Sequence, residues 1–129
     1  MAEIVSLSLN KNILKQLDSL QKELGFSGRS ETVRAGIREL LQQNKERAKL
    51  KGTVDAVILI THDDKYTKDV SEIRHQYTGI IKTQIHNHLE NHLCSELFVL
   101  RGNAPLILEL FEDFQRYKHI GYARLISLN

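Results

Sequence analysis

The chain opens with alternating apolar and polar positions in residues 4–9, Ile-Val-Ser-Leu-Ser-Leu. From residue 5 on, every second position is apolar, which is the period of a half-buried β-strand. A single strand with one apolar face needs a second strand beside it. We therefore expect two copies of residues 3–9 to pair as an antiparallel ribbon in a dimer. In this register the inward positions are Val5, Leu7 and Leu9, and the outward positions are Ile4, Ser6 and Ser8.

Two amphipathic helices are predicted after this strand. Asn10 is suited to cap a helix that runs to about Leu24, and Gly25 then supplies a C-terminal stop. Ser30 is predicted to cap the second helix. The apolar positions recur at helical spacing in both segments. They are Ile13, Leu14, Leu17, Leu20 and Leu24 in the first, and Val33, Ile37, Leu40 and Leu41 in the second.

The composition changes near residue 50, where residues 42–52 form a polar stretch that ends in glycine. This stretch indicates a linker between two domains, which we place at 1–48 and 53–129. The second domain is predicted to have strands at 54–61, 79–89, 94–100 and 121–128, and helices at 66–75 and 105–118. The order β-α-β-β-α-β matches a ferredoxin-like arrangement, so the fold class is α+β.

Composition and charge narrow the class of protein only slightly. Of 129 residues, 41% are hydrophobic and 26% charged, which is typical of a soluble globular protein. The net charge of +2 is compatible with nucleic-acid binding but does not argue for it. No apolar run approaches the ~20 residues that span a bilayer, and the first residues lack a signal-peptide pattern. We expect a cytoplasmic protein with no membrane partner.

Candidate metal ligands gather in one segment of the second domain. Three of the six histidines fall within residues 86–92, close to the single cysteine, Cys94. His86 and His88 are two positions apart on a predicted strand, so their side chains point to the same face. Cys94 begins the next strand, one hairpin away, and can lie beside them. Two imidazoles and a thiolate suit Ni(II), Cu(II) or Zn(II), with zinc favouring a tetrahedron and a planar N/S site favouring nickel or copper.

The first 45 residues resemble the ribbon-helix-helix (CopG-like) DNA-binding fold. The resemblance is carried by the order strand, helix, helix and by the sequence Gly-Phe-Ser-Gly-Arg-Ser-Glu at 25–31. In that family a paired ribbon enters the major groove of DNA, which is ~12 Å wide. The resemblance implies that Ile4, Ser6 and Ser8 read base edges and that Arg29 contacts phosphate. The alternative is a dimerisation module that pairs with another protein, as antitoxins of this fold do.

Over almost its whole length the chain resembles the NikR family of nickel-responsive transcriptional regulators. The motif His-x-His-x5-Cys-x-Glu at 86–96 carries this resemblance together with the order of the elements. It implies an ACT-like C-terminal domain and a homotetramer built as a dimer of dimers. It also implies one Ni2+ per subunit, bound by His86, His88 and Cys94 of one chain and by His75 of another. Glu96 matches an acidic position that orients such ligands.

The function implied by this resemblance is repression of metal-uptake genes. Metal binding between subunits would change the affinity for a pseudo-palindromic operator, without catalysis. Three alternatives remain open: a related regulator of Cu, Co or Zn, an ACT-type sensor of a small molecule, and a metalloenzyme with a cupin-like histidine motif. His92 is either a loop residue or an alternative ligand, and no role is assigned to His62 or His119. Family members can hold a cation between a glutamate, which matches Glu31 here, and an acidic residue four positions later. In this chain the second position is Ala35, which has no carboxylate.

Overall fold

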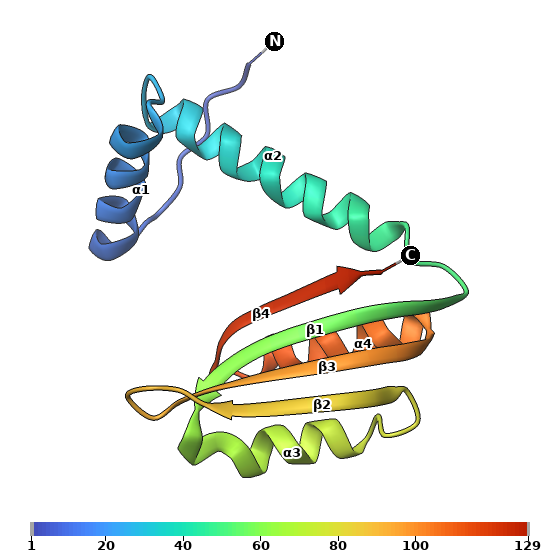
Figure 1. Cartoon of the computed structure of the whole chain (residues 1–129). Helices are drawn as coiled ribbons and strands as arrows, with labels where there is room; N and C mark the ends of the chain where they lie inside the picture. Colours follow the sequence, from blue (N-terminus) through green and yellow to red (C-terminus); the bar gives the residue numbers. More distant parts are fainter. Residues whose placement is uncertain (1, 129) are drawn as a thin grey trace. The chain divides into compact units, whose positions relative to one another are not determined.

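The computed structural model describes residues 2–128 and divides into two compact units (Figure 1). The first unit extends to Glu46 and the second begins at Arg47. Two helices follow the N-terminal segment, α1 (Lys11–Leu24) and α2 (Arg29–Ala48). None of the helices formed by residues 2–128 is long and apolar enough to cross a membrane.

The ends of α1 follow from two residues in the local sequence. The Asn10 side chain accepts a hydrogen bond of 2.9 Å from the backbone N–H of Ile13, which satisfies one of the unpaired donors of the first turn. Gly25 adopts the left-handed conformation with φ of 74°, and its N–H donates to the carbonyl of Gln21. Glycine reaches this region without steric cost. Both predicted ends of the first helix are confirmed.

The second helix begins two residues earlier than expected. Arg29 is already helical, and the N–H of Thr32 donates to the carbonyl of Gly28 at 3.1 Å. The prediction that Ser30 caps this helix is therefore wrong, because the first helical hydrogen bond is accepted by Gly28 and Ser30 lies within the first turn.

Residues 2–10 form no strand in the structure of the single chain. Ile4, Val5 and Leu7 are 101%, 75% and 70% exposed. A strand exists only through hydrogen bonds to a neighbouring strand, and the predicted neighbour is a second copy of the same segment. The intertwined ribbon-helix-helix dimer accordingly stays a prediction.

The second unit is a four-stranded antiparallel sheet in the order β2-β3-β1-β4. Its elements follow one another in the predicted β-α-β-β-α-β order, with a short 3₁₀ turn before the first helix (Figure 1). The elements are β1 (Thr53–Asp63), η1 (Asp64–Tyr66), α3 (Thr67–His75), β2 (Ile81–His88), β3 (Leu93–Asn103), α4 (Ala104–Arg116) and β4 (Ile120–Ser127).

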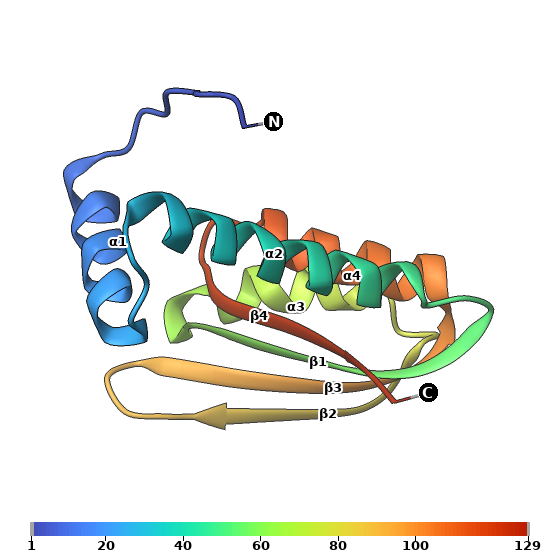
Figure 2. The same ribbon diagram turned by 90° about the horizontal axis from the view of Figure 1, so that it is seen from above.

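Helices α3 and α4 lie on one face of this sheet, where the core is buried (Figure 2). Along β1, every second residue from Val54 to Ile60 is buried, and β3 alternates in the same way. The rings of Phe98 and Phe114 stack with centroids 5.4 Å apart. Burying one such large apolar side chain contributes ~1.5–3 kcal/mol, so this face holds the unit together.

Helices α3 and α4 leave the opposite face of the sheet uncovered (Figure 2). Val57, Leu59, Leu97 and Val99 alternate with the core residues on the two central strands and are only half-buried in the single chain. On β4, Ile126 lies opposite Val57 and is 50% exposed. Taken by itself, the second unit therefore leaves a hydrophobic surface open on this face.

Candidate metal centre

The candidate site lies where the apolar pattern of the core ends in polar residues. The inward positions of β1 end in His62, and those of β3 begin with Cys94 and Glu96. Strand register places His62 and His88 on either side of Cys94, so that the three form one row across β1, β3 and β2. The neighbouring row contains Glu96 opposite His86.

The turn between β2 and β3 determines the position of His88 in this row. Asn91 and His92 have left-handed φ values of 58° and 63°, which is uncommon for residues other than glycine. The N–H of Leu89 donates to the carbonyl of Leu93 at 2.7 Å and closes the hairpin. Because the turn is tight, His88 comes directly opposite Cys94.

The structure brings together three of the four metal ligands suggested by the sequence. The Nδ1 of His88 lies 3.4 Å from the Sγ of Cys94, and the rings of His86 and His88 are 4.9 Å apart. Cys94 is buried, while His86 is partly exposed and His88 exposed. These three side chains therefore meet at the end of the sheet where β2 finishes.

His62 was missed by sequence reasoning, which assigned it no role. Its ligand atom, one from His86 and the Sγ of Cys94 all lie within 4.8 Å of one another. Among residues 2–128 this is the group of three or more potential ligands that could hold a metal ion. A signal was present in the sequence, because His62 continues the inward alternation of β1 at a position where an apolar residue is expected.

Glu96 is buried, with 3% of its surface exposed, and it lies between His62 and His86. Its Oε2 lies 2.5 Å from the Nε2 of His62. Its Oε1 accepts a hydrogen bond of 2.8 Å from the Gln84 side chain and lies 3.5 Å from the Nδ1 of His86. Glu96 therefore contacts the rings of two potential ligands, as carboxylates beside metal-binding histidines commonly do.

His86 provides the test of whether a metal fits this site. Its Nε2 is buried and has no hydrogen-bond partner within the described part of the chain, whereas its Nδ1 faces Glu96. Buried polar atoms are rarely left unpaired, because losing hydration without a replacement bond is unfavourable. An imidazole with one nitrogen on a carboxylate and the other unpaired is arranged as a metal ligand is. The donor set therefore fits a metal ion of borderline softness.

Burial also affects the protonation of Cys94. It raises the pKa of the thiol above its usual value, and the nearby carboxylate of Asp64 raises it further. A hydrogen bond with Thr67 acts in the opposite direction. The thiolate is the form that binds metals, so metal binding must displace the proton of Cys94.

His75 lies away from the other three in its own chain. It is the last residue of α3, whereas the first residue of that helix, Thr67, is hydrogen-bonded to Cys94. A nine-residue helix is about 13 Å long, so His75 stands far from the cluster. Its Nδ1 lies 2.9 Å from the carbonyl oxygen of Ser71, and the residue is exposed.

Two further histidines lie outside the cluster. The Nδ1 of His92 is 3.3 Å from Asp64, and the His92 side chain is 80% exposed in the hairpin turn. His119 stacks on Tyr66 with ring centroids 3.8 Å apart. Neither belongs to the group of potential ligands found in residues 2–128.

The candidate DNA-contacting residues belong to the first unit. Ile4, Ser6 and Ser8 are exposed. Arg29 is held by Asp18 through two hydrogen bonds of 2.9 and 3.1 Å. Glu31, considered for a cation site, instead pairs with Arg34 and Arg38.

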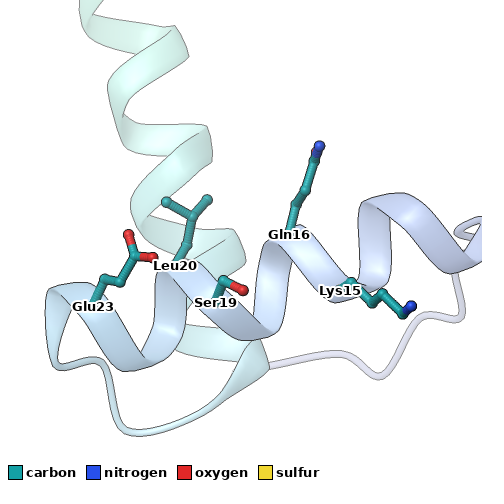
Figure 3. A pocket seen from close by; sticks show the side chains of 5 residues that line it. All are labelled: Lys15, Gln16, Ser19, Leu20 and Glu23. Carbon is teal, nitrogen blue, oxygen red and sulfur yellow. The ribbon is translucent and has the colours of Figure 1, made fainter.

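A shallow depression on α1 carries no comparable chemistry. Figure 3 shows its lining, which consists entirely of exposed side chains of one helix. The residues are Lys15, Gln16, Ser19, Leu20 and Glu23.

The fold and the site define an ACT-like domain with a candidate site for a borderline metal ion. Residues 55–128 match the family described as the NikR C terminal nickel binding domain. The chain belongs to the NikR family of nickel-responsive regulators.

Several relatives match this chain over nearly its whole length, and each bears the name of a nickel-responsive regulator. The one from Methanococcus vannielii is 35% identical over 94% of this chain and 88% of its own. Those from Methanocaldococcus jannaschii and Methanococcoides burtonii are 32% and 31% identical, each over 94% of this chain and 88% and 89% of their own lengths.

Two solved structures share the fold of the second unit. An uncharacterized protein of Thermotoga maritima aligns with a TM-score of 0.55 at 15% identity, covering 60% of this chain and 99% of that one. The ACT domain from the GTP pyrophosphokinase of Chlorobium tepidum aligns with a TM-score of 0.50 at 13% identity, covering 57% and 99%. The ACT-like fold is thereby confirmed for the C-terminal domain.

Proposed function

We propose that this protein is a nickel-responsive DNA-binding repressor of metal-uptake genes and not an enzyme. Its nickel site would consist of His86, His88 and Cys94 of one chain and His75 of another, with one Ni2+ per subunit. The unpartnered, buried Nε2 of His86 beside Cys94 is the observation that carries this proposal. We propose nickel as the metal because the relatives are named as nickel-responsive regulators.

The position of His75 supports a site shared between chains. Its Nδ1 is occupied by the Ser71 carbonyl, which leaves Nε2 as the nitrogen that can bind a metal. His75 is exposed at the far end of α3, where it can meet another subunit but not its own Cys94. A bound Ni2+ ion would supply the bonds that join the two chains.

The open sheet face and the N-terminal segment support assembly as a dimer of dimers. Ile126 and Ile85 leave apolar surface exposed on the sheet face opposite the helices, and a second sheet can cover it. Val5 and Leu7 leave a second apolar surface exposed in the first unit. Two different self-complementary contacts on one chain are what a homotetramer of this kind requires.

The N-terminal segment supports the proposal of DNA binding. Ser6 and Ser8 alternate with the apolar positions, so pairing of Val5 and Leu7 with a second copy would turn the hydroxyls outward. A two-stranded ribbon of this kind fits the major groove. Because Asp18 holds the Arg29 guanidinium, we expect Arg29 to contribute little to phosphate binding unless this ion pair opens. A repressor of this kind would act in the cytoplasm, where its pseudo-palindromic operator is.

Nickel binding and operator binding would be coupled through the tetramer. Joining the C-terminal domains of different chains limits the distance between the two ribbons, so that both can reach half-sites of one operator. By thermodynamic linkage, operator DNA must then strengthen nickel binding by the same factor. A sensor of a small molecule would not need the ligand set at the end of the sheet.

A gel shift on the protein's own promoter region, with Ni2+, Cu2+, Co2+, Zn2+ or no metal, tests this function. We expect a strong shift with nickel that Cys94→Ala abolishes and His119→Ala, outside the cluster, retains. Equal shifts with and without metal would remove the sensor function. A stronger response to another metal would replace nickel as the effector.

A further inference from the structure

Cys94 lies between two histidines, and only one of them belongs to the proposed nickel site. His88 is on the outer side, on the edge strand β2, and His62 is on the inner side, on β1. Cys94 and His86 can therefore combine with either histidine. The donor atoms within 4.8 Å of one another are those of His62, His86 and Cys94.

The surroundings of His62 turn one nitrogen toward the cluster. Its Nδ1 lies 2.8 Å from the carbonyl oxygen of Asp63, which can only accept, so Nδ1 carries a hydrogen. The Nε2 is then the atom that faces Glu96 and the other donors. The pairing of β1 with β4 shifts register between Thr61 and His62, and such bulges commonly redirect a side chain beside a functional site.

We propose that His62, His86 and Cys94 form a second metal site within one chain, suited to Zn2+. Two imidazoles and a thiolate with one open position match zinc sites that have three protein ligands. Zinc accepts a tetrahedral arrangement, in which donor atoms lie about 3.5 Å apart, so closing the cluster requires movements of about 1 Å. Planar nickel coordination instead needs a fourth protein donor, which here would come from another chain.

Glu96 allows this exchange of ligands without leaving a buried charge unpaired. Because Nδ1 of His62 already carries a hydrogen, its hydrogen bond from Nε2 to Oε2 of Glu96 holds a second proton. When zinc binds Nε2, this proton is released to solvent and a metal bond replaces the hydrogen bond. The other oxygen of Glu96 keeps its contacts with Gln84 and His86. The carboxylate also lies close to the added positive charge, which favours binding.

The effect of this second site on DNA binding rests on the proposed function. A zinc ion held by donors of one chain makes no bond to His75 of another, so it leaves the subunits unlinked. The same Cys94 cannot serve both sites at once. Zinc at His62 would therefore occupy the chain without producing the DNA-binding form.

The proposal is tested on the full chain with His62→Gln and the matched variants His119→Gln and His88→Gln. Zn2+ affinity is measured by competition with a chromogenic chelator, and Co2+ absorption reports tetrahedral coordination. We expect His62→Gln to weaken Zn2+ at least about tenfold and to abolish the tetrahedral Co2+ bands, because it removes a ligand. Ni2+ affinity should change less than about threefold, whereas His88→Gln should weaken Ni2+ more than Zn2+.

Equal weakening of Zn2+ and Ni2+ in His62→Gln would overturn the proposal, since His62 would then act only through Glu96. Unchanged Zn2+ affinity would overturn it as well. Because His62 is buried, a second measurement avoids the substitution: long-range ¹H–¹⁵N spectra of the wild-type imidazoles during Zn2+ titration. We expect the Nε2 resonance of His62 to move into the range of metal-bound nitrogen, and a spectrum in which only His86 and His88 respond would contradict the site. If Zn2+ binds through His62 but nickel produces no gel shift, the proposed function fails and this site remains.

Discussion

The Nε2 of His62 lies 2.5 Å from Oε2 of Glu96, and both side chains are buried at the end of the hydrophobic core. A histidine and a glutamate are rarely buried unless each has a polar partner. The other oxygen of Glu96 contacts Gln84 and His86. This carboxylate therefore connects the core of the domain to the potential metal ligands.

Removing the Glu96 carboxylate should weaken metal binding more than removing any exposed carboxylate. In Glu96→Ala, His86 loses the group that faces its Nδ1 and His62 is left buried without its partner. We expect Ni2+ affinity to fall about 10–100-fold, measured by chelator competition. Glu90→Ala, in the exposed hairpin turn, is the matched control. An affinity within about threefold of wild type would show that Glu96 does not orient the ligands.

Nickel binding should depend on pH through Cys94. Burial raises the pKa of this thiol, so it is protonated at neutral pH and its proton must leave when metal binds. The apparent Ni2+ affinity should therefore rise about tenfold per pH unit from about pH 7 upward, until the raised pKa is passed.

Titrations between about pH 6 and 9, with proton release measured in weak buffer, test this dependence. Release of about one proton per Ni2+ near neutral pH is the expected result. A flat affinity above neutral pH would mean that Cys94 is already a thiolate or does not bind the metal.

Gly102 on β3 should tolerate no side chain. A Cβ added there would lie 2.5 Å from the Cγ2 of Ile80 and 3.2 Å from its Cβ. Ile80 is 5% exposed and its β-branched side chain has little freedom to move. Gly102→Ala should lower the free energy of unfolding by about 1–3 kcal/mol in urea denaturation. Gly79→Ala, where a Cβ meets nothing within 4 Å, should have a much smaller effect.

The cap of α1 should contribute measurably to stability. Asn10→Ala removes the acceptor for the N–H of Ile13 and should lower the free energy of unfolding by about 1 kcal/mol. Asn12→Ala is a control of the same chemistry within the helix, where alanine is the better helix former. Denaturation at one fixed protein concentration measures both. Equal effects of the two substitutions would contradict the capping role of Asn10.

Much of the local structure could be predicted because it depends on neighbouring residues. Asn10 and Gly25 set the ends of α1 through their own hydrogen bonds and backbone conformation. The strand predicted at 54–61 lies within β1 (Thr53–Asp63). Ser30 was placed wrongly because several polar or small residues precede the helix, and local sequence alone did not decide whether Gly28 or Ser30 accepts its first hydrogen bond.

The sequence by itself determined that His86, His88 and Cys94 meet, since a period of two and one tight hairpin are local properties. Only the tertiary structure decided that His62 joins them. His62 and Cys94 are far apart along the chain and become neighbours only when β1 pairs with β3. Pairing between distant strands depends on packing of the whole sheet against α3 and α4, which no short segment specifies. The buried position of Glu96 between two histidines has the same origin.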